Sequence, residues 1–176
     1  MKIRRVVTGH GVNGKSRVAS DEMVEPVTVA LAPGMEFHRL WGSDSAPAYP
    51  DDGSPLSGHA YFPPADGFRF ISFMVPAATS AEPAAVPDVG AAVAEAENKL
   101  PGLLGHMEPE NPGFHTTQTV DMLYVVSGAI VMRLDEGEVE LRAGDVYVQS
   151  GTRHAWVNRG SEPAVLVGVI VGARRK

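Results

Sequence analysis

Short apolar and β-branched runs, separated by Gly and Asp turns, dominate the last third of the chain. These runs occupy residues 121–126, 129–134, 139–141 and 146–149. The turns between them lie at 127–128, 135–137 and 143–145. Runs of this length, bounded by turn residues, are typical of antiparallel strands joined in sequence. The pattern therefore predicts an all-β barrel or sandwich, not a parallel sheet.

Polar residues recur at alternate positions at both ends of this stretch. Because side chains on a strand alternate between its two faces, each row would line one face. Each row begins with a histidine. The rows are His115, Thr117, Thr119 and Asp121, and then His154, Trp156 and Asn158. We expect them to converge inside a small barrel.

The same residues resemble the two motifs of the cupin family. The first motif is a His-x-His pair, three or four residues, an acid, six residues and a Gly. Asp121 stands at the acid, with six residues between it and Gly128. The three-residue spacing places His115 and Thr117 at the two histidine positions, whereas the four-residue spacing places Phe114 and Thr116 there.

The second cupin motif runs from Gly-Asp through a Pro-x-Gly turn to a His and an Asn. Its counterparts here are Gly144, Asp145, Gly151, His154 and Asn158, with no proline in the turn. The resemblance implies a single cupin jelly-roll, a double-stranded β-helix barrel, whose core spans residues 114–172. Because strands, turns and Gly spacing agree, the resemblance is strong for the fold.

The first two thirds of the chain add strands, a long loop and one short peripheral helix. Strands are predicted at 3–8, 27–31, 35–41 and 68–75, and residues 1–76 form an N-terminal unit of strands and loop. The loop, 42–67, is expected to be an ordered lid or an intersubunit arm because of Tyr49, His59, Tyr61 and Phe62. Residues 77–113 form a linker and a helix that Asp88 caps and that ends near Leu100. We expect one domain over 1–176.

Composition and charge exclude several function classes. The chain has 176 residues, 44% of them hydrophobic, and no cysteine, so disulfides, thiolate metal sites and cysteine nucleophiles are excluded. A net charge of −6 argues against a nucleic-acid partner. Neither a membrane-spanning run nor a signal-peptide core is visible, so we expect no membrane partner and a cytoplasmic location.

The stretch Gly9–Ser16 matches the phosphate-loop pattern Gly-x4-Gly-Lys-Ser. Phosphate binding requires this loop to open a helix whose N-terminal amides face the phosphates. The residues that follow, 17–26, show no apolar stripe at helical spacing. We therefore favour a hairpin loop, and nucleotide binding at Gly9–Ser16 remains a remote alternative.

The resemblance implies two kinds of chemistry at the convergent rows. His115, Asp121 and His154 could hold a divalent transition metal, iron, manganese, nickel, zinc or copper, in a two-His-one-carboxylate set. Without metal, His154 and Asp121 could act as acid and base, since Asp121 would raise the pKa of His154 and orient its ring. Thr117, Thr119 and Trp156 would contact the substrate.

We therefore expect an enzyme acting on a small oxygenated organic molecule in the barrel, as a dioxygenase or as an isomerase, dehydratase or lyase. A non-catalytic small-molecule-binding cupin is the alternative, because one fold serves many functions. We also expect a homodimer formed through the N-terminal strands.

Overall fold

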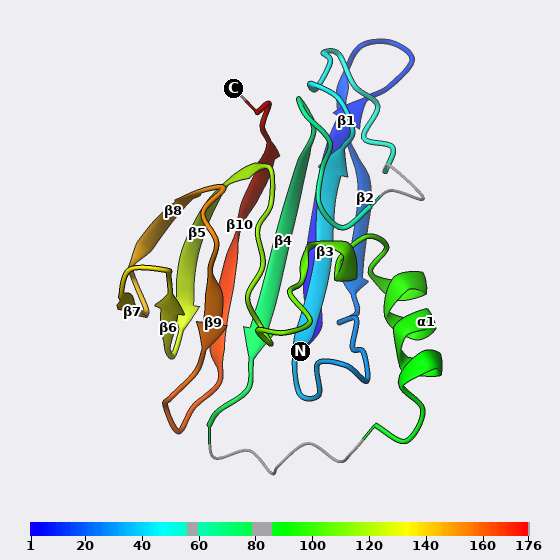
Figure 1. The fold of residues 1–176 in the computed structure, drawn as a ribbon. Helices are drawn as coiled ribbons and strands as arrows, with labels where there is room; N and C mark the ends of the chain where they lie inside the picture. The colour runs from blue at the N-terminus through cyan, green and yellow to red at the C-terminus, as the bar shows by residue number, and fades with distance from the viewer. Residues whose placement is uncertain (56–59, 79–85, 176) are drawn as a thin grey trace.

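The computed structural model describes residues 1–55, 60–78 and 86–175. Ten strands in these residues form three antiparallel sheets, and one α-helix and one 3-10 turn lie between the fourth and fifth strands of the chain (Figure 1). The first half comprises β1 (Ile3–His10), β2 (Ser16–Val24), β3 (Glu36–Ser43), β4 (Phe68–Val75), α1 (Val89–Lys99) and η1 (Leu104–His106). The second half comprises β5 (Thr119–Ser127), β6 (Ala129–Arg133), β7 (Glu138–Arg142), β8 (Val146–Ser150), β9 (Ala155–Val157) and β10 (Ala164–Gly172).

The barrel is built from two sheets that enclose the core. One has the strand order β3-β4-β10-β5-β8, and the other the order β7-β6-β9. Because strand side chains alternate, inward positions are buried, as for Leu123 and Val125 on β5 and Leu166 and Ile170 on β10. The all-β barrel predicted from the sequence is confirmed.

Turn glycines separate the strands of the last third as predicted. Gly128, Gly137 and Gly144 have φ values of 74°, 91° and 99°. This left-handed region is open to glycine at little cost. At Gly128 a Cβ would also lie 2.4 Å from the carbonyl oxygen of Pro163, so a side chain there would collide with the turn before β10.

The N-terminal predictions are confirmed except at one strand. Residues 27–31 form only one isolated bridge, between Val27 and Phe37. The Val27 amide donates to the Phe37 carbonyl at 2.7 Å, and the Phe37 amide donates to the Val27 carbonyl at 2.9 Å. The chain then turns, and the Ala32 amide donates to the Val29 carbonyl at 3.1 Å. An early turn before Pro33 therefore replaces the predicted strand.

The helix prediction is confirmed at its N-terminus. The Asp88 carboxylate accepts a hydrogen bond of 2.9 Å from the Ala91 amide, and α1 runs over Val89–Lys99. This cap satisfies one of the amides that a helix start leaves unpaired. Ala92 and Ala96 are buried, so α1 packs against the outside of the barrel along its small residues (Figure 1).

The phosphate-loop pattern lies in a hairpin. β1 ends at His10 and β2 begins at Ser16, and these two strands pair antiparallel from Ile3 with Val24 to His10 with Ser16. A strand, not a helix, follows Ser16, so the helix amides that phosphate binding requires are missing at this loop. The hairpin prediction is confirmed.

No helix in the described ranges is long and apolar enough to cross a membrane.

Candidate functional site

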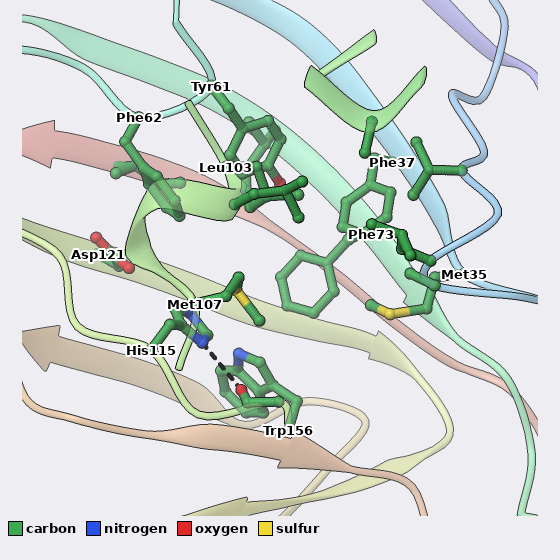
Figure 2. Close-up of a pocket in the computed structure, with 18 of the residues that line it drawn as sticks. Met35, Phe37, Tyr61, Phe62, Phe73, Leu103, Met107, His115, Asp121 and Trp156 are labelled. Carbon is green, nitrogen blue, oxygen red and sulfur yellow. Dashed lines mark hydrogen bonds between the residues drawn. The ribbon is translucent and has the colours of Figure 1, made fainter. Parts of the chain in front are cut away.

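A cavity of about 200 Å³ lies between the barrel sheets and the segment that carries η1 (Figure 2). Most of its wall is apolar. The apolar lining includes Val29, Leu31, Met35, Phe37, Phe62, Phe73, Leu103, Met107, Leu123, Trp156 and Ile170. Such a wall favours a ligand with a largely apolar body.

Four titratable side chains line the cavity: Tyr61, His115, Asp121 and His154. Trp156 lines the same cavity, with its ring centroid 5.7 Å from that of His154. The structure therefore brings together four of the six site residues predicted from the sequence.

The two histidines are joined through their backbones. The His115 amide donates to the His154 carbonyl at 3.0 Å, and the His154 amide donates to the His115 carbonyl at 3.1 Å. This isolated antiparallel bridge lies outside the named strands. It places the two imidazole rings with their centroids 4.2 Å apart.

Backbone carbonyls set the tautomer of both imidazoles. His115 Nδ1 lies 3.1 Å from the Gly113 carbonyl oxygen, and His154 Nδ1 lies 2.9 Å from that of Thr152. A carbonyl oxygen only accepts, so each Nδ1 carries the hydrogen. Both neutral rings therefore keep the Nε2 lone pair for a ligand.

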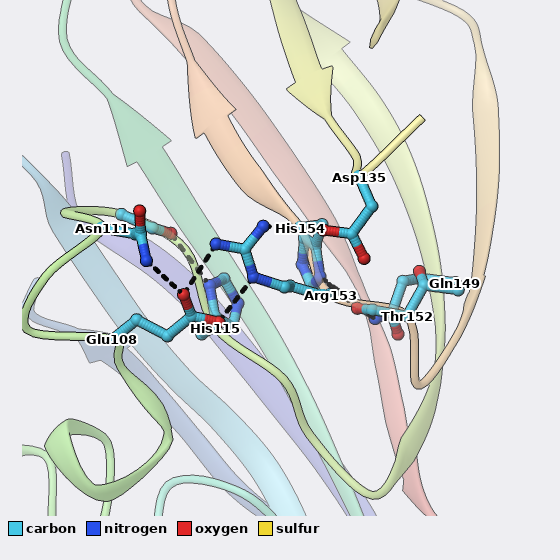
Figure 3. Close-up of polar contacts among 9 residues, drawn as sticks. Glu108, Asn111, His115, Asp135, Gln149, Thr152, Arg153 and His154 are labelled. Carbon is cyan, nitrogen blue, oxygen red and sulfur yellow. Dashed lines mark hydrogen bonds and ion pairs between the residues drawn. The ribbon is translucent and has the colours of Figure 1, made fainter. Parts of the chain in front are cut away.

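Gln149 supports His154 from the strand β8. Its side-chain amide donates to the Thr152 carbonyl at 2.7 Å, the same oxygen that accepts from His154 Nδ1, and this shared acceptor brings the two nitrogens to 3.1 Å from each other. The Gly151 amide donates to Gln149 Oε1 at 3.2 Å, which fixes the orientation of the amide. The loop before β9 is thus held so that His154 keeps its position (Figure 3).

Asp121 reaches the cavity from β5. In the sheet register it lies between Ile170 on β10 and Gln149 on β8. Its carboxyl group is buried, and Oδ1 has no hydrogen-bond partner among the described residues. A buried carboxyl oxygen without a partner is costly, which favours a ligand at this position.

Burial controls the pKa values of the site. It lowers the pKa of His154 to about 4, with the neighbouring His115 as a second cause. It also lowers the pKa of His115. It raises the pKa of Asp121 to about 6, against a smaller opposing effect of the Thr119 hydroxyl. The expectation that Asp121 raises the pKa of His154 is wrong, because desolvation dominates.

The predicted metal set does not assemble in this structure. Across the described residues, no group of three or more His, Asp or Glu side chains is placed to hold a metal ion. The two imidazoles adjoin each other, but Asp121 does not complete a ligand group with them. As placed here, the donor set does not fit the two-His-one-carboxylate centre that the family resemblance implies.

Thr117 and Thr119 lie at a different hollow. They are buried, their hydroxyl oxygens are 2.7 Å apart, and they line a second, more polar depression together with His106, Ser150 and Arg174. The predicted polar row is continuous, because the Thr119 hydroxyl lies between that of Thr117 and the Asp121 carboxyl group. Of the three residues, Asp121 lines the apolar cavity and the two threonines line the second depression.

The long loop also contributes to the cavity. Tyr61 and Phe62 line it, and their rings are perpendicular with centroids 5.0 Å apart. Two residues of the loop 42–67, predicted to be an ordered lid or an intersubunit arm, therefore form part of the cavity wall, whereas His59 of that loop lies outside the described residues. Two adjacent aromatic residues in a polar, Pro-rich loop were the signal in the sequence.

An ion-pair cluster beside the cavity was not predicted. Arg153 donates to both carboxylate oxygens of Glu108 at 2.6 and 2.7 Å, and to Asp135 at 2.7 Å (Figure 3). Its guanidinium also lies 3.9 Å from the centre of the Phe114 ring. The cluster joins the segment that carries Met107 and His115 to the loop that carries His154. No local pattern pairs Glu108 with Arg153.

Residues 104–170 match the family model for the cupin domain. This chain contains a cupin domain. The matched residues include His115, Asp121 and His154, so the candidate site lies in this domain. The N-terminal strands, the long loop and α1 precede the matched part.

A solved cupin domain shares the fold over almost the whole chain. The Cnp3 cupin domain of Schizosaccharomyces pombe superposes with a TM-score of 0.50 and 11% sequence identity. The match covers 98% of this chain and 89% of that one. At this identity the likeness shows the fold alone.

Two fungal relatives match over a shorter part of the sequence. Phomopsin biosynthesis cluster protein C' of Diaporthe leptostromiformis is 48% identical over 46 residues, which is 26% of this chain and 24% of the relative. Oryzines biosynthesis cluster protein J of Aspergillus oryzae is 44% identical over 48 residues, 27% of each chain. The matches thus span about a quarter of these relatives.

Proposed function

We propose that this cupin domain is an enzyme that transfers a proton on a small, mostly apolar molecule bearing a hydroxyl group. Asp121 is the proposed general base, and His115 and His154 hold the hydroxyl. The observation that carries the proposal is the unpartnered Oδ1 of Asp121 in the same cavity as the two facing imidazoles. Two relatives named for biosynthesis clusters support a small organic substrate.

The polar groups of the cavity favour a ligand that donates hydrogen bonds. Each imidazole offers an Nε2 lone pair, since Nδ1 donates to a backbone carbonyl. The Asp121 carboxylate also accepts. A hydroxyl, phenol or enol bound there donates its single hydrogen to the facing Nε2 atoms and leaves Asp121 free to take a proton from carbon, while the apolar wall takes the rest of the molecule.

The pKa of Asp121 suits a base at neutral pH. Burial raises this pKa to about 6, so the carboxylate is a stronger base than an exposed aspartate and is still mainly ionised at pH 7. His154, whose pKa is lowered to about 4, stays neutral and keeps its acceptor role. Proton removal next to a carbonyl, the first step of many isomerisations and dehydrations, is the reaction we assign.

Proton exchange in D₂O tests the proposal. The probe is 2-hydroxy-1-phenylethanone, which combines an aromatic body with a hydroxyl and an exchangeable C–H group. We expect the protein to accelerate exchange at that carbon, followed by ¹H NMR. Asp121→Asn should lower the rate about 100-fold, in line with loss of a general base.

Asp21→Asn is the matched control, because it makes the same chemical change on the exposed β1–β2 hairpin and should leave the exchange rate unchanged. Hydroxyacetone, which lacks the aromatic ring, should exchange more slowly at equal concentration. Binding of the aromatic probe without exchange would contradict catalysis and support the non-catalytic binder.

A further inference from the structure

The outer face of the five-stranded sheet carries a continuous apolar row. In the strand register, Trp41 on β3 pairs with Phe70 on β4, and Phe70 pairs with Val169 on β10. Val169 then pairs with Met122 on β5, and Met122 with Val148 on β8. Paired residues share one face of a sheet. The row therefore crosses all five strands.

A second row lies beside the first. Val167 on β10 pairs with Tyr124 on β5, and Tyr124 pairs with Val146 on β8. Val146 and Val148 are 75% and 64% exposed, and Tyr124 is 45% exposed. The outward positions of β4, β10, β5 and β8, all within the described ranges, include no charged residue. We call this surface, formed by Phe70, Met122, Tyr124, Val146, Val148, Val167 and Val169, the outer strip.

Within residues 1–55, 60–78 and 86–175, the outer face of the sheet is covered at the β3 end. The β1–β2 hairpin lies against β3, where Arg5 donates to the Leu40 carbonyl at 2.7 Å and its guanidinium lies 5.4 Å from the Trp41 ring centre. The His38 ring also bonds the Met1 carbonyl at 2.6 Å. Over β5 and β8 the strip stays exposed.

The size of the strip matches a protein interface. Scaling the exposed fractions of Phe70, Met122, Tyr124, Val126, Val146 and Val148 by full areas of roughly 150–250 Å² gives roughly 600 Å². A stable interface buries roughly 800 Å² per partner, so a partner that also touches the rim reaches this size. An exposed apolar patch of this extent lies at the upper end of those on monomeric proteins, and such patches are often functional.

Shape and charge favour a second copy as the partner. A broad face of β-branched side chains fits another such face, because sheets pack face to face about 10 Å apart. Because the outward positions of β4, β10, β5 and β8 carry no charged residue, packing two strips together buries no like charges, although two copies of net charge −6 repel at long range. The same charge disfavours an anionic lipid surface.

We propose that two copies of this chain form a twofold dimer by packing their outer strips together. Each strip then covers the other, as isologous contacts require. The dimer is independent of the function proposed above. It also differs from a dimer through the N-terminal strands, because it uses β5, β8 and β10.

Analytical ultracentrifugation of the full chain tests the dimer with the same substitution at three sites. Val148→Lys places a charge in the strip, Val12→Lys places one in the exposed β1–β2 loop, and Val6→Lys places one on the exposed side of β1. Because all three valines are at least half exposed, each variant should fold, which circular dichroism verifies. We expect a wild-type dimer whose Kd rises about 100-fold in Val148→Lys, as burial of an unpaired charge predicts.

The two control variants should keep the wild-type Kd. A monomeric wild-type chain at 100 µM or a Val148→Lys variant with unchanged Kd would overturn the proposal. Loss of the dimer in Val6→Lys alone would overturn it in favour of the N-terminal strands. Because the chain has no cysteine, single-cysteine variants at Met122, Tyr124 and Val146 add a second readout. The variant nearest the twofold axis should form a disulfide between copies on oxidation, whereas Val12→Cys should not.

Discussion

His115 and His154 face each other across the candidate site, with their ring centroids 4.2 Å apart and their backbones joined by two reciprocal hydrogen bonds. Two cations at this separation would repel strongly, and burial adds to the cost of charging either ring. The pair is therefore stable as two neutral imidazoles. This relationship makes the site a set of hydrogen-bond acceptors.

NMR tests the charge state of this pair. Because burial lowers the pKa of His154 to about 4, we expect its ring to stay neutral at pH 6, with the hydrogen on Nδ1. Side-chain ¹⁵N shifts distinguish the two tautomers and the cation. A His154 ring that is cationic at pH 6, or one protonated at Nε2, would contradict this assignment.

The stability of the protein should fall as the pH falls through the range of His154. Its folded pKa, about 4, lies below the unfolded value of about 6.5, so the unfolded chain binds more protons between these pH values. The stabilisation is complete above pH 6.5 and is lost toward pH 4. Urea unfolding should show that His154→Gln is less sensitive to pH than wild type in this window.

Asp121 should have the opposite effect. Its folded pKa, about 6, lies above the unfolded value of about 3.9, so its contribution to stability is complete below pH 3.9 and is lost as the pH rises to 6. Because asparagine does not ionise, the Asp121→Asn variant does not lose stability as the pH rises. We expect the variant to gain about 2 kcal/mol over wild type at pH 8 and less at pH 5, measured by urea unfolding. An equal difference at both values would show that Asp121 titrates normally.

The Arg153–Glu108 pair should hold the wall of the cavity. Arg153→Gln removes two hydrogen bonds to Glu108 and one to Asp135, so we expect faster amide hydrogen exchange over residues 107–116 and a lower free energy of unfolding. Arg159→Gln is the matched control, because Arg159 also bonds both oxygens of a carboxylate, that of Glu138, but away from the cavity. Equal effects of the two variants would count against a role for Arg153 at the site.

Elemental analysis of tag-free protein tests the metal prediction. Because Asp121 does not complete a ligand group with the two histidines, we expect less than about 0.1 equivalent of iron, manganese, nickel, zinc or copper after gel filtration. One equivalent that is lost in both His154→Ala and Asp121→Asn would instead show that the three side chains converge on a metal.

The strands and turns followed from local patterns. Alternation and turn residues placed β4 at Phe68–Val75, and the cap at Asp88 placed the start of α1. These features depend on neighbours a few residues away, which the sequence displays directly. Residues 27–31 show the limit, because their apolar pattern also suits a turn that packs over a cavity.

The candidate site also contains residues that the sequence indicated and residues that it could not indicate. The motif spacing indicated His115, Asp121 and His154, and all three line one cavity. Thr117 and Thr119 were placed with them by alternation, and Thr119 does lie beside Asp121 on β5, but neither threonine lines the cavity. The Arg153–Glu108 pair had no sequence signal, since its partners come from distant loops.

The sequence by itself determined the β-rich architecture, the turns and the residue types available for chemistry, because those depend on short-range periodicity and backbone preference. Only the tertiary structure decided that one carboxylate oxygen of Asp121 lacks a hydrogen-bond partner and that burial raises the pKa of this group. It also decided that the side chains of Met122 and Val148 remain exposed. Desolvation and exposure are set by every element that packs around a group, and those elements meet only when the chain folds.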